Sequence, residues 1–137
     1  MTNEIVELTL PSRIEAIAEA TAAAAKIANR LGLSETAIYG VDLAVREAVT
    51  NAVVHGNQQD ETKPVEITFI NLAMSLVITV RDKGNGFDPT SVPDPTLSEN
   101  LLNPTGRGLL FMRTFMDEVE WTAHPGGGTV VRMTKKL

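Results

Sequence analysis

Three polar residues follow one another at four-residue spacing within an apolar stretch. Glu47, Asn51 and His55 would therefore project from neighbouring points on one face of a helix. The amide oxygen of Asn51 suits Mg²⁺, which prefers hard oxygen ligands and takes few of them from protein. Glu47 is placed to accept a proton from an attacking hydroxyl or water. The alternative is an ordinary polar helix face, which this spacing alone does not exclude.

A second group follows a β-branched run. Asp82 ends the run, and Gly84 and Gly86 come after it. Glycines let a backbone approach a ligand closely, and a buried carboxylate can accept a hydrogen bond from an exocyclic amine such as that of adenine. A plain turn at the end of a strand explains the same residues. The pattern is not a Rossmann fingerprint, because no third spaced glycine opens a helix.

Two more glycine-containing segments could line an anionic ligand. Gly106, Arg107 and Gly108 stand where a long loop meets a predicted helix, and helix-terminal amides with a guanidinium suit phosphate. No Gly-Lys-Ser/Thr follows, so this is not a P-loop. Gly128 and Thr129 open the last predicted strand, where the Thr129 hydroxyl could reach a ligand or a neighbouring strand. A solvated helix entry and a flexible hairpin are the respective alternatives.

Periodicity and capping signals predict the elements that position these residues. Alternating apolar residues predict an edge strand from Glu4 to Leu10, ended by Pro11. Ser12 and Glu15 form a capping-box pattern before a first, alanine-rich helix. The remaining predictions are a helix over 34–55 capped by Ser34, strands over 65–72 and 75–81, a functional loop over 83–105, a helix over 108–116, and strands over 118–123 and 129–135.

This order of elements predicts an α+β fold. Strands joined by hairpins, with helices before and between them, favour a two-layer sandwich with helices on one face of a mixed, mainly antiparallel sheet. The sequence has no internal repeat and no linker, so we expect one domain over residues 1–137.

Composition excludes several classes of protein. The net charge of -5 argues against direct binding to nucleic acid. The sequence has no cysteine, which excludes disulfides and thiolate metal sites, and its two histidines do not predict a zinc site. No apolar run is long enough to span a membrane and the N-terminus does not resemble a signal peptide, so we expect a cytoplasmic protein.

The motifs, taken in order, carry a resemblance to a known family. Glu47-x-x-x-Asn51-x-x-x-His55-Gly56-Asn57, Asp82-x-Gly84-x-Gly86, Gly106-Arg107-Gly108-Leu109 and Gly128-Thr129 resemble the N, G1, G2 and last G boxes of the histidine-kinase-like (Bergerat) ATPases. Within that superfamily, segments 45–52, 80–82 and 115–117 resemble the bacterial anti-sigma-factor serine-protein kinases.

The resemblance implies an ATP- and Mg²⁺-dependent kinase that phosphorylates a serine of an anti-sigma-factor antagonist and sequesters a sigma factor, commonly as a homodimer. It assigns Asn51 to Mg²⁺, Glu47 to general-base catalysis and Asp82 to the adenine amine. The remaining nucleotide-lining positions that it implies are Gly84, Gly86, Gly106, Gly108 and Thr129. On physical grounds, Arg107 is a candidate contact to the terminal phosphates.

Two other functions fit the same motifs. The proline-rich segment 87–105 motivates a nucleotide-gated partner-binding module without kinase activity. A detached catalytic domain of a two-component histidine kinase also fits, although we expect such a domain to follow a helical hairpin with a phosphoacceptor histidine. Phosphoserine on a partner would distinguish the kinase from both.

Overall fold

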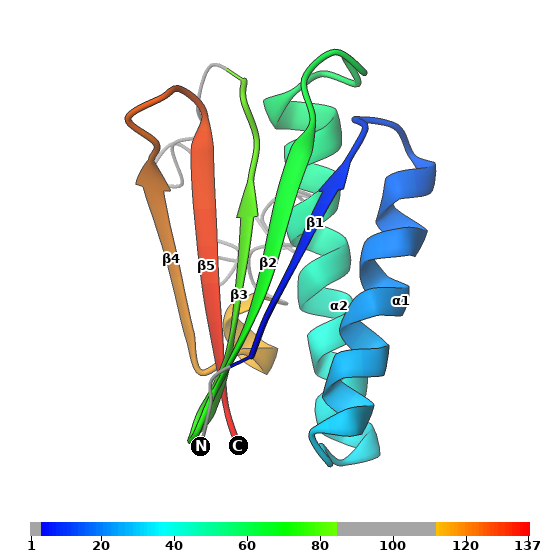
Figure 1. Cartoon of the computed structure of the whole chain (residues 1–137), viewed down its shortest axis with the longest axis vertical. Coiled ribbons are helices and arrows are strands. Elements are labelled where there is room, and N and C mark those ends of the chain that lie inside the picture. The colour runs from blue at the N-terminus through cyan, green and yellow to red at the C-terminus, as the bar shows by residue number, and fades with distance from the viewer. Residues whose placement is uncertain (1–3, 85–111) are drawn as a thin grey trace, which may run out of the picture.

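The computed structural model describes residues 4–84 and 112–137 (Figure 1). Two helices follow the first strand, the second helix continues directly into a π-helical turn, and four more strands complete the sheet. The elements are β1 (Glu4–Leu10), α1 (Glu15–Arg30), α2 (Glu35–Thr50), η1 (Asn51–Gly56), β2 (Val65–Leu72), β3 (Ser75–Arg81), β4 (Glu118–Ala123) and β5 (Thr129–Lys136).

The five described strands form one sheet in the order β1-β2-β3-β5-β4. Every pair of neighbouring strands among the described residues is antiparallel. The mainly antiparallel sheet that was predicted is therefore purely antiparallel in this part of the chain. β1 lies at an edge, which confirms the prediction made from its position before Pro11. The last hairpin places β5 in the interior and β4 at the opposite edge.

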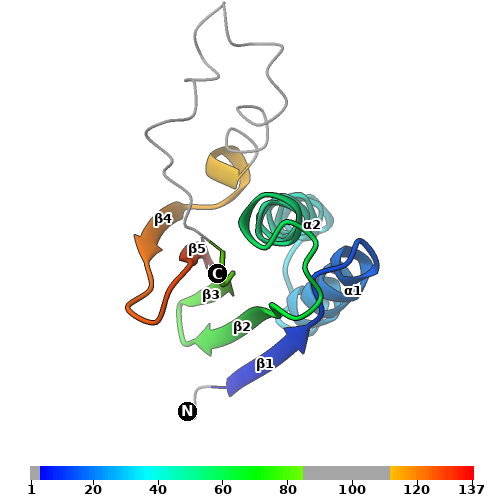
Figure 2. The same ribbon diagram turned by 90° about the horizontal axis from the view of Figure 1, so that it is seen from above.

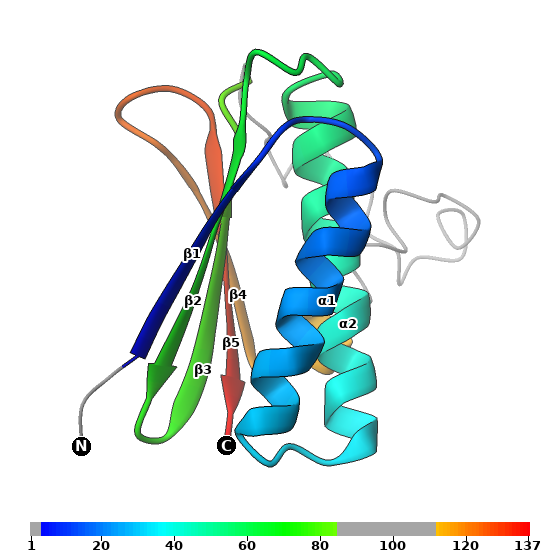
Figure 3. The ribbon, with the colours of Figure 1, turned by 45° about the vertical axis from the view of Figure 1, so that its right-hand side comes forward.

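Helices α1 and α2 lie together on one face of the sheet (Figures 2 and 3). The predicted two-layer α+β sandwich is therefore confirmed. Alanines on α1 recur at four-residue spacing and are almost fully buried, which lets the two helices pack closely. These alanines are Ala16, Ala20, Ala24 and Ala28.

The core lies between the helices and the central strands. Ile78 on β3 pairs with Phe69 on β2 and with Met133 on β5, and at most 1% of each side chain is exposed. Alternation sends these residues to the helix side of the sheet, where they meet Val45 and Val49 of α2. Burying each such side chain stabilises the fold by about 1.5–3 kcal/mol, which fixes the register of α2 over the sheet.

One of the two predicted helix caps is wrong. Ser12 does not cap α1, whose first residue follows Ile14 without a side-chain cap. The Ser12 hydroxyl instead donates to the carbonyl oxygen of Lys63 and is fully buried, so it is not available to the helix. Ser34 does cap α2, because its Oγ accepts a hydrogen bond of 3.1 Å from the amide of Ala37.

The helix predicted over 34–55 changes its winding at Asn51. The α-helix ends at Thr50, and the π-helix η1 continues it to Gly56. The Thr50 hydroxyl donates to the carbonyl of Arg46 at 2.6 Å, a bond that competes with regular helical geometry. The predicted four-residue repeat therefore stops at Asn51, and His55 is exposed. Single π-helical turns within helices often mark functional sites.

Several predictions lie outside the described residues. These are residues 85–105 of the loop predicted over 83–105 and four candidate site residues, Gly86, Gly106, Arg107 and Gly108. Of the helix predicted over 108–116, the described part is helical at 112–115. Within the described ranges, no helix has the length and apolar character needed to cross a membrane.

Candidate functional site

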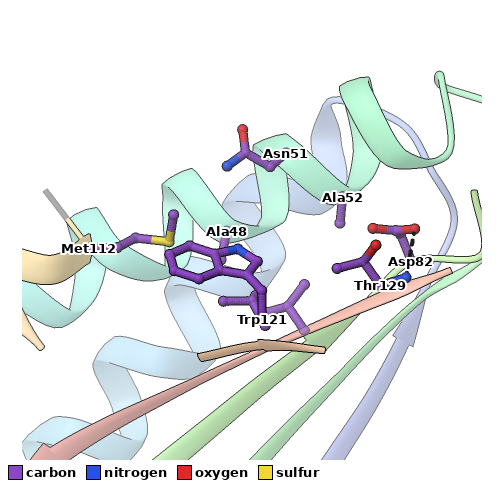
Figure 4. Close-up of a pocket in the computed structure, with 9 residues that line it drawn as sticks. Ala48, Asn51, Ala52, Asp82, Met112, Trp121 and Thr129 are labelled. Atoms are coloured by element: carbon purple, nitrogen blue, oxygen red, sulfur yellow. Dashed lines mark hydrogen bonds between the residues drawn. The ribbon is translucent and has the colours of Figure 1, made fainter. Parts of the chain in front are cut away.

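A pocket lies between the helix layer and the sheet where α2 passes into η1 (Figure 4). Its walls come from the helix, from β3 and its end, from β4 and β5, and from the turn of helix at 112–115. The fold thus brings together segments that are far apart in the sequence. The lining residues are Ala48, Asn51, Ala52, Val80, Asp82, Met112, Trp121, Thr129 and Val131.

The helix presents small residues to the pocket and holds a polar residue at its rim. Ala48 and Ala52 are buried and point towards the sheet, whereas the half-buried Asn51 directs its amide away from the sheet (Figure 4). Alanine at 48 and 52 keeps the helix from filling the space above the sheet. Asn51 can therefore offer its oxygen to a ligand group at the rim of the pocket.

Asp82 is the buried charge of this pocket, with a relative exposure of 6%. Its Oδ1 accepts hydrogen bonds from the amides of Gly84, at 3.0 Å, and Thr129, at 3.3 Å. Its own amide donates to the carbonyl of Thr129 at 3.0 Å, which fixes the residue at the end of β3. No hydrogen bond to its Oδ2 exists within the described residues. One carboxylate oxygen is thus left for a ligand donor.

Burial raises the pKa of the Asp82 carboxyl above its ordinary value, and the amides of Gly84 and Thr129 and the charge of Arg81 offset part of this shift. A desolvated carboxylate with one oxygen not hydrogen-bonded gains more from a ligand N–H than an exposed one does. The exocyclic amine of a nucleobase is a ligand group of this kind.

Three glycines permit the close packing around Asp82. A Cβ on Gly56 would stand 2.4 Å from Asp82 Cγ, and one on Gly128 would stand 2.0 Å from the Asp82 carbonyl oxygen. A Cβ on Gly84 would stand 1.7 Å from the Gly56 carbonyl oxygen. All three distances are shorter than any side chain tolerates. Gly84 is therefore required by the end of η1, a reason for glycine that the sequence did not reveal.

Glu47 lies one helical turn before Asn51 and does not line the pocket itself. Burial raises the pKa of its carboxyl, and the neighbouring Arg46 partly opposes the shift. Arg46 also forms an ion pair with Asp42 at 3.3 Å, so its positive charge acts on two carboxylates, those of Asp42 and Glu47. A carboxylate with a raised pKa is a stronger base than an ordinary glutamate.

The apolar walls were not predicted as part of the site. Trp121 points from β4 towards the helix, and its indole lies next to Met112 and Ala48 (Figure 4). The guanidinium carbon of Arg113 lies 5.4 Å from the indole centroid, a cation–π contact. Trp121 is the single tryptophan in the chain, at an alternating position in a glutamate-rich strand. This alternation was the sequence signal that could have placed Trp121 on the helix side of the sheet.

The open space in the pocket is about 20 Å³, room for about one water molecule. A nucleobase would therefore have to move side chains of the wall, of which Trp121 is the largest. Among the described residues, no three His, Cys, Asp or Glu side chains form a metal cluster. The donor set fits Mg²⁺ held by one protein oxygen, from Asn51, with ligand phosphates and water completing the shell.

The pocket therefore unites three of the predicted residues, Asn51, Asp82 and Thr129. Gly84 lies next to it through its bond to Asp82, and Glu47 lies one helical turn away. The chain also matches the family described as "Histidine kinase-like ATPase domain" over residues 10–135. It belongs to this family.

Two relatives that are similar to this chain in sequence carry different names. "Serine-protein kinase RsbW" of Bacillus subtilis is 31% identical over 140 residues, covering 98% of this chain and 86% of the relative. "Anti-sigma F factor" of Caldanaerobacter subterraneus subsp. tengcongensis is 33% identical over 137 residues, covering 98% of this chain and 95% of the relative. The likeness therefore extends over nearly the full length of each.

A solved structure supports the histidine kinase-like ATPase fold. The crystal structure of the RsbU and RsbW domains of a Mycobacterium tuberculosis protein superposes with a TM-score of 0.68 at 21% identity. The match covers 98% of this chain, which spans 32% of the longer one.

Proposed function

We propose that this chain is an ATP- and Mg²⁺-dependent serine-protein kinase that also acts as an anti-sigma factor. Membership of the histidine kinase-like ATPase family supports the use of ATP. The names of its relatives, serine-protein kinase and anti-sigma F factor, support the two activities. Residues 1–137 act as one ATPase and kinase domain.

The single observation that carries this proposal is the state of Asp82. It is a buried carboxylate in an apolar pocket, with Oδ1 bound by two backbone amides and Oδ2 accepting no hydrogen bond from the described residues. Burying a carboxylate costs free energy that an adenine amine would recover. Asp82 therefore binds the base.

The other residues take their roles from their positions around Asp82. Asn51, at the rim, holds Mg²⁺, which neutralises charge on the phosphates when it is bound. Gly84 and Thr129 line the nucleotide beside the base. We assign Gly86, Gly106 and Gly108 to the same lining and Arg107 to the terminal phosphates, on the sequence motifs alone.

The reaction transfers the γ-phosphoryl group of ATP to a serine hydroxyl. The bond from the γ-phosphorus to the β–γ bridging oxygen breaks, ADP leaves, and the serine oxygen forms the new bond to phosphorus. Glu47 takes the proton of that hydroxyl, and its raised pKa suits it to this task. The substrate serine belongs to an anti-sigma-factor antagonist.

The second partner is a sigma factor, which the kinase sequesters. We propose a homodimer that works in the cytoplasm without binding nucleic acid or membrane. The net charge of -5 supports the absence of a nucleic-acid site.

Phosphotransfer to a candidate antagonist from the same genome tests the proposal. We expect Mg-ATP to yield phosphoserine on the antagonist, detected by mass spectrometry. Glu47→Gln should abolish the product and leave ATP binding intact, whereas Glu35→Gln, an exposed glutamate on the same helix, should leave both intact. ATP-dependent partner binding without phosphoserine would instead indicate a nucleotide-gated module. Full activity of Glu47→Gln would contradict the role of Glu47.

A further inference from the structure

Asn57 is a buried polar residue that the proposed reaction does not use. It follows η1, and its relative exposure is 1%. Its backbone N–H donates to the carbonyl oxygen of Ala52, five residues earlier, at 2.8 Å. The π-helical turn thus ends by turning the Asn57 side chain into the protein. A buried side-chain amide must have hydrogen-bond partners for both its oxygen and its nitrogen, or it destabilises the fold.

Both ends of the Asn57 side chain are occupied. Its Oδ1 accepts a hydrogen bond of 2.7 Å from the amide of Lys83. Its Nδ2 donates to Ser12 Oγ at 2.8 Å and to the carbonyl oxygen of Lys63 at 2.9 Å. An amide donor faces one end and a carbonyl acceptor faces the other, so this network fixes the orientation of the side chain.

The bond to Lys83 acts on the turn that carries Asp82. Lys83 stands between Asp82 and Gly84, whose amide donates to Asp82 Oδ1. The Asn57 side chain therefore directs one amide of the turn and the Asp82 carboxylate directs the next. Backbone packing of Gly84 against Gly56, the residue before Asn57, holds the same turn from a second side.

We propose that Asn57 is a positioning residue for the nucleotide site, which holds the turn 82–84 so that the Asp82 carboxylate is aimed into the pocket before the base arrives. This inference rests on the proposed function. Preorganised groups bind more tightly because the ordering cost is met during folding and not during binding. The π-helical turn contributes to this arrangement, because it places the Asn57 side chain within hydrogen-bond distance of the Lys83 amide.

Ser12 separates this role from a purely structural one. It shares the buried network, since it accepts from Asn57 and donates to Lys63, yet it makes no contact with the turn 82–84 among its hydrogen bonds. Removing its hydroxyl leaves the bond from Lys83 to Asn57 in place. Ser12→Ala and Asn57→Ala should therefore both lower stability and differ in their effect on nucleotide binding.

The experiment is calorimetric titration of ATP with Mg²⁺ into wild type, Ser12→Ala and Asn57→Ala, at a temperature where circular dichroism shows each to be folded. We expect Asn57→Ala to weaken ATP binding about fivefold, the effect of one lost hydrogen bond, and Ser12→Ala to stay within about twofold of wild type. Equal affinity of folded Asn57→Ala and wild type would overturn the inference, and so would equal losses in both variants.

A second measurement needs no variant of Asn57. In the wild-type protein without ATP, NMR should show the backbone amide of Lys83 already protected from hydrogen exchange, because it donates to Asn57 Oδ1. A Lys83 amide that exchanges freely until ATP is bound would overturn the inference and leave the proposed function standing. A wild-type protein that binds no ATP at all would overturn the proposed function, and this inference with it.

Discussion

Gly84 packs against Gly56 so closely that a Cβ on Gly84 would lie 1.7 Å from the Gly56 carbonyl oxygen. This contact joins the end of the π-helical turn to the turn that carries Asp82. The helix with Asn51 and the strand end with Asp82 are therefore joined by this backbone contact as well as by the hydrogen bond from Lys83 to Asn57. The geometry of the pocket depends on two residues that have no side chains.

Gly84→Ala should weaken both the fold and ATP binding. The added methyl group meets backbone, which cannot move aside as a side chain can, so overpacking should destabilise the protein by about 1–3 kcal/mol and displace the turn. Thermal unfolding and ATP titration measure the two effects.

Gly32→Ala is the matched control for that variant. Gly32 has φ +78, and a Cβ added there would meet no atom of the described residues within 4 Å, so alanine strains only the backbone. It should lower stability and leave the ATP affinity of the folded protein unchanged. An equal loss of affinity in both variants would contradict a specific role for the Gly84–Gly56 contact.

Asp82→Asn should lose ATP binding and gain stability at neutral pH. The raised pKa of Asp82 means that the folded protein holds this proton more tightly than the unfolded chain does. The stability contributed by the group is therefore present below the ordinary value of 3.8 and falls as pH rises through the raised pKa. Asparagine keeps an Oδ1 for the amides of Gly84 and Thr129 and removes the desolvated charge.

Urea unfolding of wild type and Asp82→Asn checks this prediction when it is measured at several pH values from about 4, close to the ordinary aspartate pKa, up to about 7. The difference in free energy of unfolding should move in favour of the variant as pH rises. A difference that moves the other way would show that the Asp82 charge stabilises the free protein.

Phosphotransfer should depend on the protonation of Glu47. Burial raises the pKa of Glu47 above its ordinary value of 4.5, and a general base must be deprotonated to act. Turnover under saturating ATP should therefore fall as pH drops through that raised pKa, at a pH above 4.5. A midpoint at or below the ordinary value would contradict a desolvated Glu47 base.

Trp121 should report nucleotide binding through its fluorescence. The space beside it admits about one water molecule, so a base that enters the pocket must shift the indole or its neighbours. As the single tryptophan, it gives a signal that needs no correction for others. ATP should change the emission of wild type and leave that of Asp82→Asn unchanged; an unchanged wild-type spectrum at saturating ATP would place the base elsewhere.

The fold was predictable because its signals are local. Alternation and turn residues gave β1, the β2–β3 hairpin and the β4–β5 hairpin, and Ser34 gave the start of α2. The Ser12 capping box was wrong because a long-range partner, the carbonyl of Lys63, takes the hydroxyl. Local patterns do not show which distant group competes for a side chain.

The site was predictable only in part for the same reason. Asn51, Asp82 and Thr129 stood out because polar residues among apolar ones or beside glycines need a partner. The Asn57 bond to Lys83 joins residues 26 positions apart, and the Trp121 wall depends on β4 lying opposite α2. Such contacts leave no periodic pattern in the sequence.

Calorimetric titration of ATP with and without Mg²⁺, into wild type, Asn51→Ala and Asp82→Asn, tests the central claim most directly. We predict that wild type binds ATP more tightly with Mg²⁺ than without it. Asn51→Ala should lose this dependence on Mg²⁺, and Asp82→Asn should lose binding under both conditions. Binding that is the same in all three proteins, or no binding by wild type, would contradict a nucleotide site built on Asn51 and Asp82.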